Sequence, residues 1–268
     1  MSRINQCFTN LKEQKKKALI PFITAGDPTP NHTVDIMHSL VANGSDVIEL
    51  GMPFSDPMAD GPVIQLACER SLAAGTSIKK VLDIVSEFRQ TNNDTPVVLM
   101  GYLNPIEFFG YEEFTIAAKN AGVDGVLLVD LTPEEATDVV QLFKANGLDL
   151  IYLLSPTTTP ERAKKICKLA SGYVYYVSIK GVTGTASLDV ASVKRHVDSL
   201  KEITDLPIGV GFGIRDSETA QKVSQCSDGV IVGSVLVNCI AENQQSSSLK
   251  IGEELGKILL PMRQAMDA

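Results

Sequence analysis

The chain has 268 residues, of which 44% are hydrophobic and 21% charged, as is ordinary for a globular protein. Its net charge of −8 argues against a nucleic-acid-binding or anionic-membrane-binding protein, because no basic excess is available to neutralise phosphates. No stretch approaches the roughly 18 consecutive apolar residues of a membrane span, and the polar N-terminus does not resemble a secretion signal, so we expect a cytoplasmic protein.

Short β-rich runs alternate with helical patterns along the whole chain. The first helical pattern covers about Arg3–Lys17 and precedes all of the runs. The runs are nearly continuously apolar, as expected for strands that are covered on both faces. They are Ala18–Thr24, Asp46–Gly51, Pro96–Tyr102, Gly125–Asp130, Leu148–Ser155, Tyr173–Ser178, Pro207–Gly213 and Asp228–Ser234.

The segments between the runs have helical spacing. Thr33–Ala42 ends in the stop signal ANG, and Pro133–Ala145 is a second predicted helix with Thr132 as its N-cap. Eight strand-then-helix units without a low-complexity linker predict one α/β domain over residues 1–268, a (β/α)8 TIM barrel. The helix at Arg3–Lys17 is then an extra N-terminal helix that closes or flanks the bottom of the barrel. A doubly wound open sheet is the alternative, although the usual GxGxxG turn is absent after the first strand.

Glu49 interrupts the apolar pattern of the second run. In the sequence DVIELG, Glu49 shares one face with Val47, while Ile48 and Leu50 share the other. If Ile48 and Leu50 meet the surrounding helices, Glu49 points into the barrel near the strand ends where barrel enzymes carry their active sites. Burying a carboxylate for structure alone costs free energy, and no run contains a Lys or Arg that could pair with it. A buried ion pair is the alternative, and an acid–base role is favoured.

Asp60 lies on the loop that follows the same run. Three prolines and a glycine restrict this loop, MPFSDPMADGP, so that it can hold side chains over the end of the strand. Loop aspartates such as Asp56 and Asp60 are often simple turn formers. Asp60 differs because it follows an inward-facing glutamate, and two carboxylates in unlike surroundings can divide acid and base roles.

Histidine, cysteine and metal chemistry are poorly supported. His32, His38 and His196 fall on helical segments, and no metal-ligand cluster is recognisable, so we predict no metal site. The five cysteines are scattered without a CxxC pair and are expected to be free thiols. Carboxylates therefore remain the acid–base candidates.

Glycines at the last two strand ends indicate a phosphorylated ligand. Gly213 ends the seventh run, and Gly233 and Ser234 end the eighth. In TIM barrels these two loops, with a short helix after the eighth strand, commonly bind phosphate through backbone N–H groups. Val235–Ile240 is the predicted helix, with Ser234 as its cap. Tight turns without a ligand are the alternative.

The segment after the sixth run, SIKGVTGTAS, has few side chains that could pack, which predicts a mobile lid. Thr183 and Gly184 are its candidates for closing on a ligand. Aromatic residues near strand ends could form an apolar wall around the ligand, although each could equally belong to the core. They are Phe22, Tyr102, Tyr175 and Phe212.

Together these segments resemble the tryptophan synthase alpha subunit family. The run IELGMPFSDPMADG, together with PFITAGDP, KGVTGTA, GVGFGI and VGS, matches the motifs of that family in order and spacing over essentially the full length. The resemblance implies a lyase of tryptophan biosynthesis that cleaves indole-3-glycerol phosphate to indole and glyceraldehyde 3-phosphate in a retro-aldol-type reaction. It implies proton transfer by Glu49 and stabilisation of an indolenine cation by Asp60.

The resemblance also implies the other site residues and a partner. The residues expected to hold the phosphate are Gly184, Gly213, Gly233 and Ser234. Those expected to line the indole pocket are Phe22, Tyr102, Leu127, Tyr175 and Phe212. Thr183 would meet Asp60 when the lid closes. The family's partner is a beta subunit in an αββα complex; pyridoxal phosphate is expected on that subunit and no cofactor on this chain. The expected partner contacts are Pro53, Asp56 and Asn104.

Three other functions are compatible with parts of the pattern. A stand-alone indole-3-glycerol phosphate lyase would release free indole. A non-catalytic subunit that only activates the beta partner would be favoured by loss of either carboxylate, but Glu49 and Asp60 are both present. A different barrel enzyme acting on a phosphorylated sugar adduct would often need Lys or Cys at strand ends, which is missing here.

Overall fold

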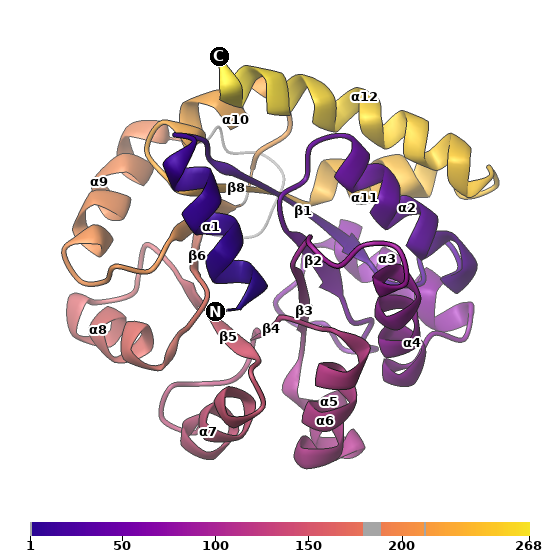
Figure 1. The fold of residues 1–268 in the computed structure, drawn as a ribbon, viewed down its shortest axis with the longest axis horizontal. Coiled ribbons are helices and arrows are strands. Elements are labelled where there is room, and N and C mark those ends of the chain that lie inside the picture. The colour runs from indigo at the N-terminus through magenta and orange to yellow at the C-terminus, as the bar shows by residue number, and fades with distance from the viewer. Residues whose placement is uncertain (1, 179–188, 212) are drawn as a thin grey trace.

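The computed structural model describes residues 2–178, 189–211 and 213–268. Within these ranges eight parallel strands close into a barrel, in which each strand pairs with the next and β8 pairs with β1 (Figure 1). The pairing of β8 with β1 excludes an open doubly wound sheet and confirms the predicted TIM barrel. Thr183, Gly184 and Phe212 lie outside the described residues.

Every expected strand is present. The strands are β1 Ala18–Thr24, β2 Ile48–Gly51, β3 Val97–Gly101, β4 Gly125–Leu128, β5 Asp149–Leu154, β6 Val174–Val177, β7 Ile208–Gly211 and β8 Gly229–Val232. β1 has the predicted bounds, and the others are shorter than predicted at one or both ends. Asp46 and Asp228 precede β2 and β8, and each binds the neighbouring strand twice, since its backbone N–H donates to that strand and its carboxylate accepts a backbone N–H from it.

Helices follow the strands on the outside of the barrel (Figure 1). They are α1 Arg3–Glu13, α2 Pro30–Ala42, α3 Pro62–Ala73, α4 Ile78–Arg89, α5 Leu103–Phe109, α6 Tyr111–Ala121, α7 Thr137–Ala145, α8 Pro160–Leu169, α9 Val190–Lys201, α10 Ser217–Ser224, α11 Ser234–Glu242 and α12 Ser248–Asp267. His32 and His38 lie on α2 and His196 on α9, as predicted from their helical surroundings. Across the described ranges, none of these helices combines the length and the apolarity that a membrane crossing requires.

The predicted start of α7 is wrong. The helix begins at Thr137 rather than at Pro133, and Ala136 occupies the N-cap position. The Thr132 hydroxyl donates to Glu135 Oε2 at 3.0 Å instead of accepting a backbone N–H. The local capping pattern is therefore satisfied by a side-chain contact within the loop, and the helix starts one turn later.

The N-terminal helix α1 closes the bottom of the barrel, which was one of the two predicted placements. Ile4, Phe8 and Leu11 of α1 pack into the cluster that fills the barrel interior. The Phe8 ring lies 5.7 Å from that of Tyr173, centroid to centroid. Arg3 fixes the helix from the side, since its guanidinium binds Asp124 Oδ1 at 2.8 Å.

The core has two layers that follow the alternation of the strands. Side chains such as Val47 and Leu127 point inward and form the interior cluster with α1. Side chains such as Ile48 and Leu50 point outward and pack against the helices. The alternation along β2 therefore turns Glu49 toward the barrel interior, where the sequence placed it.

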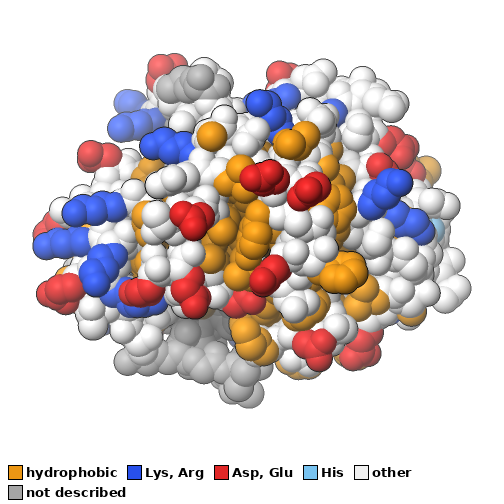
Figure 2. Space-filling view, turned by 90° about the horizontal axis from the view of Figure 1, so that it is seen from below, with side chains coloured by type: hydrophobic (Ala, Val, Ile, Leu, Met, Phe, Trp, Pro, Cys, Tyr) orange, Lys and Arg blue, Asp and Glu red, His pale blue; other side chains and the backbone are white. Residues whose placement is uncertain are grey.

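One side of the molecule carries an uncovered apolar band. Seen from the side of α5, α6 and α7, hydrophobic side chains gather between acidic ones (Figure 2). Phe108 on α5 is 94% exposed and Ile116 on α6 is 54% exposed. Contiguous exposed apolar surface of this kind often marks an interaction site.

Candidate active site

Glu49 lies on β2 inside the barrel and is fully buried. Its backbone is in register with Phe22 on β1 and Val98 on β3. Tyr173 directly precedes β6, on the far side of the barrel, and its hydroxyl donates to Glu49 Oε1 at 2.5 Å. The other oxygen, Oε2, has no hydrogen-bond partner in the described part of the chain.

The surroundings of Glu49 favour its protonated form. Among the described residues, no Lys or Arg forms an ion pair with it. Burial raises its pKa from 4.5 to about 7, and the hydrogen bond from Tyr173 partly opposes that rise. A carboxyl group with a pKa near 7 can both donate and accept a proton at neutral pH, which suits a general acid–base catalyst.

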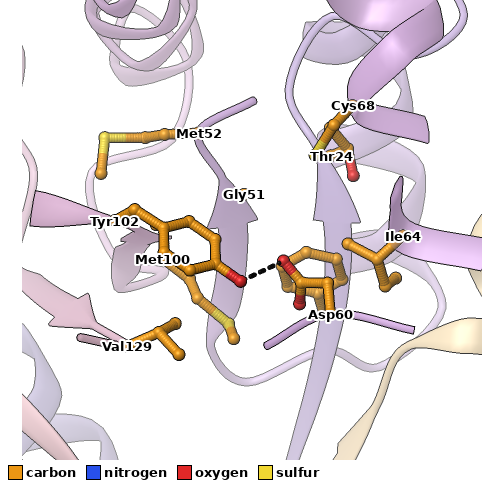
Figure 3. A pocket seen from close by; sticks show the side chains of 11 residues that line it. Thr24, Gly51, Met52, Asp60, Ile64, Cys68, Met100, Tyr102 and Val129 are labelled. Atoms are coloured by element: carbon orange, nitrogen blue, oxygen red, sulfur yellow. Dashed lines mark hydrogen bonds between the residues drawn. The ribbon is translucent and has the colours of Figure 1, made fainter. Parts of the chain in front are cut away.

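Asp60 lies on the loop between β2 and α3, residues 52–61, and its side chain faces a small pocket. The Tyr102 hydroxyl donates to Asp60 Oδ2 at 2.9 Å (Figure 3). Burial raises the pKa of Asp60, and the hydrogen bond from Tyr102 lowers it. The two candidate carboxylates therefore share a pattern, in which each receives a tyrosine hydroxyl, although Glu49 is fully buried and Asp60 only partly buried.

The pocket brings together several predicted residues and some that sequence analysis missed. Phe22, Asp60 and Tyr102 line it, as expected from the motifs. Thr24, Ile64 and Cys68 also line it and were not predicted as site residues (Figure 3). Elsewhere in the described chain, as here, no three His, Cys, Asp or Glu side chains gather in a way that could hold a metal ion.

Tyr175 and Leu127 lie deeper in the barrel interior. Both belong to the interior apolar cluster, together with Tyr173, which binds Glu49. Burial raises the pKa of Tyr175 well above its usual value, and the negative charges of Glu49 and then Asp60 raise it further. Tyr175 is thus within electrostatic range of both carboxylates.

The N-terminus of α11 lies beside this region. A Cβ added at Gly233 would lie 3.7 Å from the Phe22 side chain, so Gly233 adjoins the pocket wall. Gly233 is the N-cap of α11 and Ser234 is its first residue, so the prediction of Ser234 as the cap is wrong. The chain bends one residue earlier because Gly233 adopts φ −122° and ψ −83°. Gly213 has a φ of +83°, a conformation that favours glycine.

The predicted partner-contact residues differ in exposure. Asp56 and Asn104 are exposed, whereas Pro53 is buried. Two exposed apolar side chains lie near them in the chain, Met58 at 78% and Phe108 at 94% exposure. Asn104 and Phe108 are one turn apart on α5.

Comparison with known proteins places the chain in a family. The family model for the tryptophan synthase alpha chain matches residues 8–265. The chain belongs to the tryptophan synthase alpha chain family. The curated tryptophan synthase alpha chain of Marinobacter nauticus is 61% identical over 268 residues, covering 100% of this chain and 99% of the relative.

Solved structures of the tryptophan synthase family share the fold. The alpha subunit from Legionella pneumophila superposes with a TM-score of 0.91 and is 48% identical, covering 100% of this chain and 99% of that one. A chain of Mycobacterium tuberculosis tryptophan synthase superposes with a TM-score of 0.90 at 32% identity, covering 100% and 99%. Members of the tryptophan synthase alpha chain family are lyases, and the alpha subunit cleaves indole-3-glycerol phosphate in tryptophan biosynthesis. The family pairs with a beta subunit.

Tyr173 is the most informative residue that sequence analysis missed. In the run YVYYV, Tyr173 and Tyr175 share one face, but the sequence motifs predict only Tyr175 as a site residue. The same alternation that turned Tyr175 inward also turns Tyr173 inward, one pair of residues closer to the bottom. Tyr173 and Glu49 are 124 residues apart in the sequence, so no local sequence pattern predicts their contact.

Proposed function

We propose that Glu49 and Asp60 are the catalytic residues of indole-3-glycerol phosphate cleavage in this chain. The observation that carries the proposal is Glu49 itself, a fully buried carboxyl group inside the barrel whose pKa burial raises to about 7. A neutral indole leaves poorly as a carbanion. Protonation at C3 first gives an indolenine cation, which then leaves as neutral indole.

The proton can cycle through one side chain. Protonated Glu49 donates its proton to indole C3, and the resulting carboxylate accepts the proton of the C3′ hydroxyl as the C3–C3′ bond breaks. The electron pair of that bond restores the aromatic indole, and the hydroxyl carbon becomes the aldehyde of glyceraldehyde 3-phosphate. Glu49 ends the cycle protonated, as it began. A positioned acid–base group of this kind typically contributes about 10²–10⁴-fold in rate.

Asp60 is proposed to stabilise the cation. Its carboxylate accepts a hydrogen bond from the indole N–H, and its negative charge offsets the positive charge that develops on the indolenine. The surrounding pocket is apolar on the side of Phe22 and Met100, so the charge of Asp60 is only weakly screened there.

The substrate would span from this pocket to α11. Phe22, Tyr102, Leu127 and Tyr175 are proposed to contact the indole. Gly213, Gly233 and Ser234, with Gly184 from the undescribed segment, are proposed to bind the phosphate. The closeness of Gly233 to Phe22 supports the arrangement, since a Cβ added at Gly233 would lie 3.7 Å from the Phe22 side chain and Gly233 begins a helix. Closure of Thr183 over Asp60 remains part of the proposal, as do Phe212 as a wall residue and a cytoplasmic location.

We also propose that the face carrying Asp56, Asn104 and Phe108 docks the beta subunit in an αββα complex. Phe108 and Met58 present exposed apolar area beside these polar residues. Buried Pro53 would shape the loop at residues 52–61 rather than supply exposed area. Pyridoxal phosphate would belong to the beta subunit, while the cleavage steps above use only side chains of this chain.

One assay tests the catalytic proposal. Indole formation from indole-3-glycerol phosphate is measured for the wild type and for Asp60→Asn, each with and without a beta subunit. We expect turnover by the wild type, stimulation by the beta subunit and a strong loss in Asp60→Asn, because an amide carries no charge to offset the cation. Full activity of Asp60→Asn would remove Asp60 from its role. Stimulation of the beta subunit without any cleavage would identify a purely activating subunit.

A further inference from the structure

The hydroxyl of Tyr102 makes two hydrogen bonds to the loop that carries Asp60. It donates to Asp60 Oδ2 at 2.9 Å and accepts from the Ala59 backbone N–H at 3.0 Å. Tyr102 itself follows β3 and is 3% exposed, and its ring lies 5.3 Å from that of Phe54, centroid to centroid. One buried side chain of the barrel thus holds the loop at three neighbouring points of contact.

The chemistry of a phenol makes this arrangement directional. A tyrosine hydroxyl has a single proton, and the N–H of Ala59 occupies one of its lone pairs. The proton therefore points at Asp60, and donation from the backbone N–H strengthens the hydrogen bond that the hydroxyl gives to the carboxylate. Asp60 Oδ2 is engaged by this bond.

The backbone around Asp60 is fixed as well. Its N–H donates to the Pro57 carbonyl at 3.0 Å, and its carbonyl accepts from Gln65 Nε2 at 2.8 Å. In the described part of the chain Oδ1 of Asp60 has no hydrogen-bond partner, and the side chain faces the pocket (Figure 3). Among the described residues, Oδ1 is therefore the carboxylate oxygen that has no donor and faces the pocket.

We propose that Tyr102 is a positioning residue for Asp60, whose hydroxyl holds Oδ2 in place and leaves Oδ1 to accept the indole N–H. The inference rests on the proposed role of Asp60. It goes beyond a wall role for Tyr102, because a phenylalanine at this position would serve equally well as a wall. It separates the function of the hydroxyl from that of the ring.

Three titratable side chains from different elements bind Asp60 or lie within its electrostatic range. They are Tyr102 after β3, Cys68 on α3 and Tyr175 on β6. Of these, the Tyr102 hydroxyl is the one that donates to the carboxylate, and its hydrogen bond lowers the pKa of Asp60 against the effect of burial. Removing that hydroxyl therefore raises the pKa of Asp60 and leaves the other two groups in place.

The test is Tyr102→Phe in the full chain with the beta subunit. We expect kcat for indole formation to fall about 10- to 100-fold, as for loss of a hydrogen bond to a charged group, with KM little changed. Carbon-13 NMR of the aspartate carboxyl groups, with Asp60 assigned from Asp60→Asn, should show its pKa moving upward. A purely structural role would lower the melting temperature without moving that pKa.

Tyr152→Phe is the matched control. Tyr152 on β5 also has a buried hydroxyl, but this hydroxyl has no partner among the described residues, and the side chain packs in the outer layer. The same chemical change there should alter neither kcat nor the pKa of Asp60. Should Tyr102→Phe fail to fold, replacing Tyr102 with a fluorinated tyrosine gives a more acidic phenol of nearly the same size, and the pKa of Asp60 should then move downward.

The outcomes separate this inference from the proposed function. An unchanged pKa of Asp60 in Tyr102→Phe, or in the fluorinated protein if only that one folds, overturns the inference. So does full activity of Tyr102→Phe when Asp60→Asn is inactive. A shifted pKa of Asp60 combined with full activity of Asp60→Asn leaves the positioning role intact and overturns the catalytic role of Asp60 instead.

Discussion

Carboxylates occur at both ends of the barrel in opposite surroundings. At the bottom, Asp46, Asp124 and Asp228 each accept a backbone N–H from a neighbouring strand and each pair with Lys or Arg. In the candidate site, Glu49 and Asp60 instead receive tyrosine hydroxyls, and neither is paired with a cation among the described residues. The same chemical group thus holds strands in register at one end and is left uncompensated at the other.

The difference teaches that burial alone does not single out a candidate catalytic carboxylate. Asp124 is 5% exposed, close to the full burial of Glu49, yet Arg89 donates to its Oδ2 at 2.7 Å and Arg3 to its Oδ1 at 2.8 Å. Burial raises the pKa of Asp46 as well, but the Leu19 N–H and Arg263 oppose that rise. The distinguishing feature of Glu49 is the lack of a cation to compensate its charge.

The largest expected effect is the loss of activity in Glu49→Gln. The amide can neither donate a proton to indole C3 nor accept one from the C3′ hydroxyl, so kcat should fall by about 10²–10⁴-fold. Substrate binding should persist because the pocket keeps its shape. Rapid-quench measurement of indole formation gives kcat, and equilibrium titration gives affinity. Near-normal turnover in Glu49→Gln would place the acid–base group elsewhere.

The corresponding variant at the bottom of the barrel is Asp124→Asn, which should lower the free energy of unfolding and leave kcat unchanged. Removing one partner of a buried ion pair typically lowers the free energy of unfolding by about 3–5 kcal/mol. We expect a loss of about 3 kcal/mol, because Arg89 retains its hydrogen bonds to the Gly122 and Thr95 carbonyls. Urea denaturation measures this loss. The kcat of the folded fraction should equal that of the wild type, and a large drop in it would contradict the division of roles between the two ends.

Glu49 should also make the stability of the protein depend on pH. Well below pH 4.5 the carboxyl group is neutral in both the folded and the unfolded chain, so it does not change the free energy of unfolding. Between pH 4.5 and the folded pKa of about 7, the unfolded chain loses this proton while the folded chain keeps it, and the free energy of unfolding therefore falls as pH rises. Glu49→Gln has no such penalty. The free energy of unfolding of Glu49→Gln should exceed that of the wild type by about 3 kcal/mol at pH 8, and the difference should vanish near pH 4.

Paired denaturation curves at the two pH values check this prediction. Glu87→Gln, at an exposed position of α4, is the control for the chemical change from Glu to Gln. A wild-type chain that is as stable as Glu49→Gln at pH 8 would mean that the charge of Glu49 is compensated after all.

The smallest expected effect concerns the exposed apolar band. Phe108→Ser should weaken binding of the beta subunit by about 1–2 kcal/mol, as for loss of an aromatic interface anchor, without changing the barrel. Isothermal titration calorimetry with the beta subunit measures the change. Leu249→Ser, at a 73% exposed position at the start of α12, is the matched control and should bind normally. Equal affinities of both variants would move the docking surface away from α5.

The features that could be predicted from the sequence are those set by local periodicity. Alternation placed Glu49 on the inward face because Ile48 and Leu50 needed the helix-facing side. The start of α7 and the cap of α11 could not be predicted, because the Thr132 hydroxyl binds the Glu135 side chain and Gly233 occupies the N-cap position of α11. The contacts of Tyr173 with Glu49 and of Tyr102 with Asp60 join residues 124 and 42 positions apart, and only the closed barrel brings them together.

A single side chain, that of Tyr173, separates the N-terminal helix α1 from Glu49. Phe8 packs against the ring of Tyr173, and the Tyr173 hydroxyl binds Glu49, so α1 supports the proposed acid–base group from below. Trimming this segment during protein production would loosen the floor beneath Tyr173, although no residue of α1 lines the pocket. Affinity tags are better attached after the exposed Ala268, behind α12.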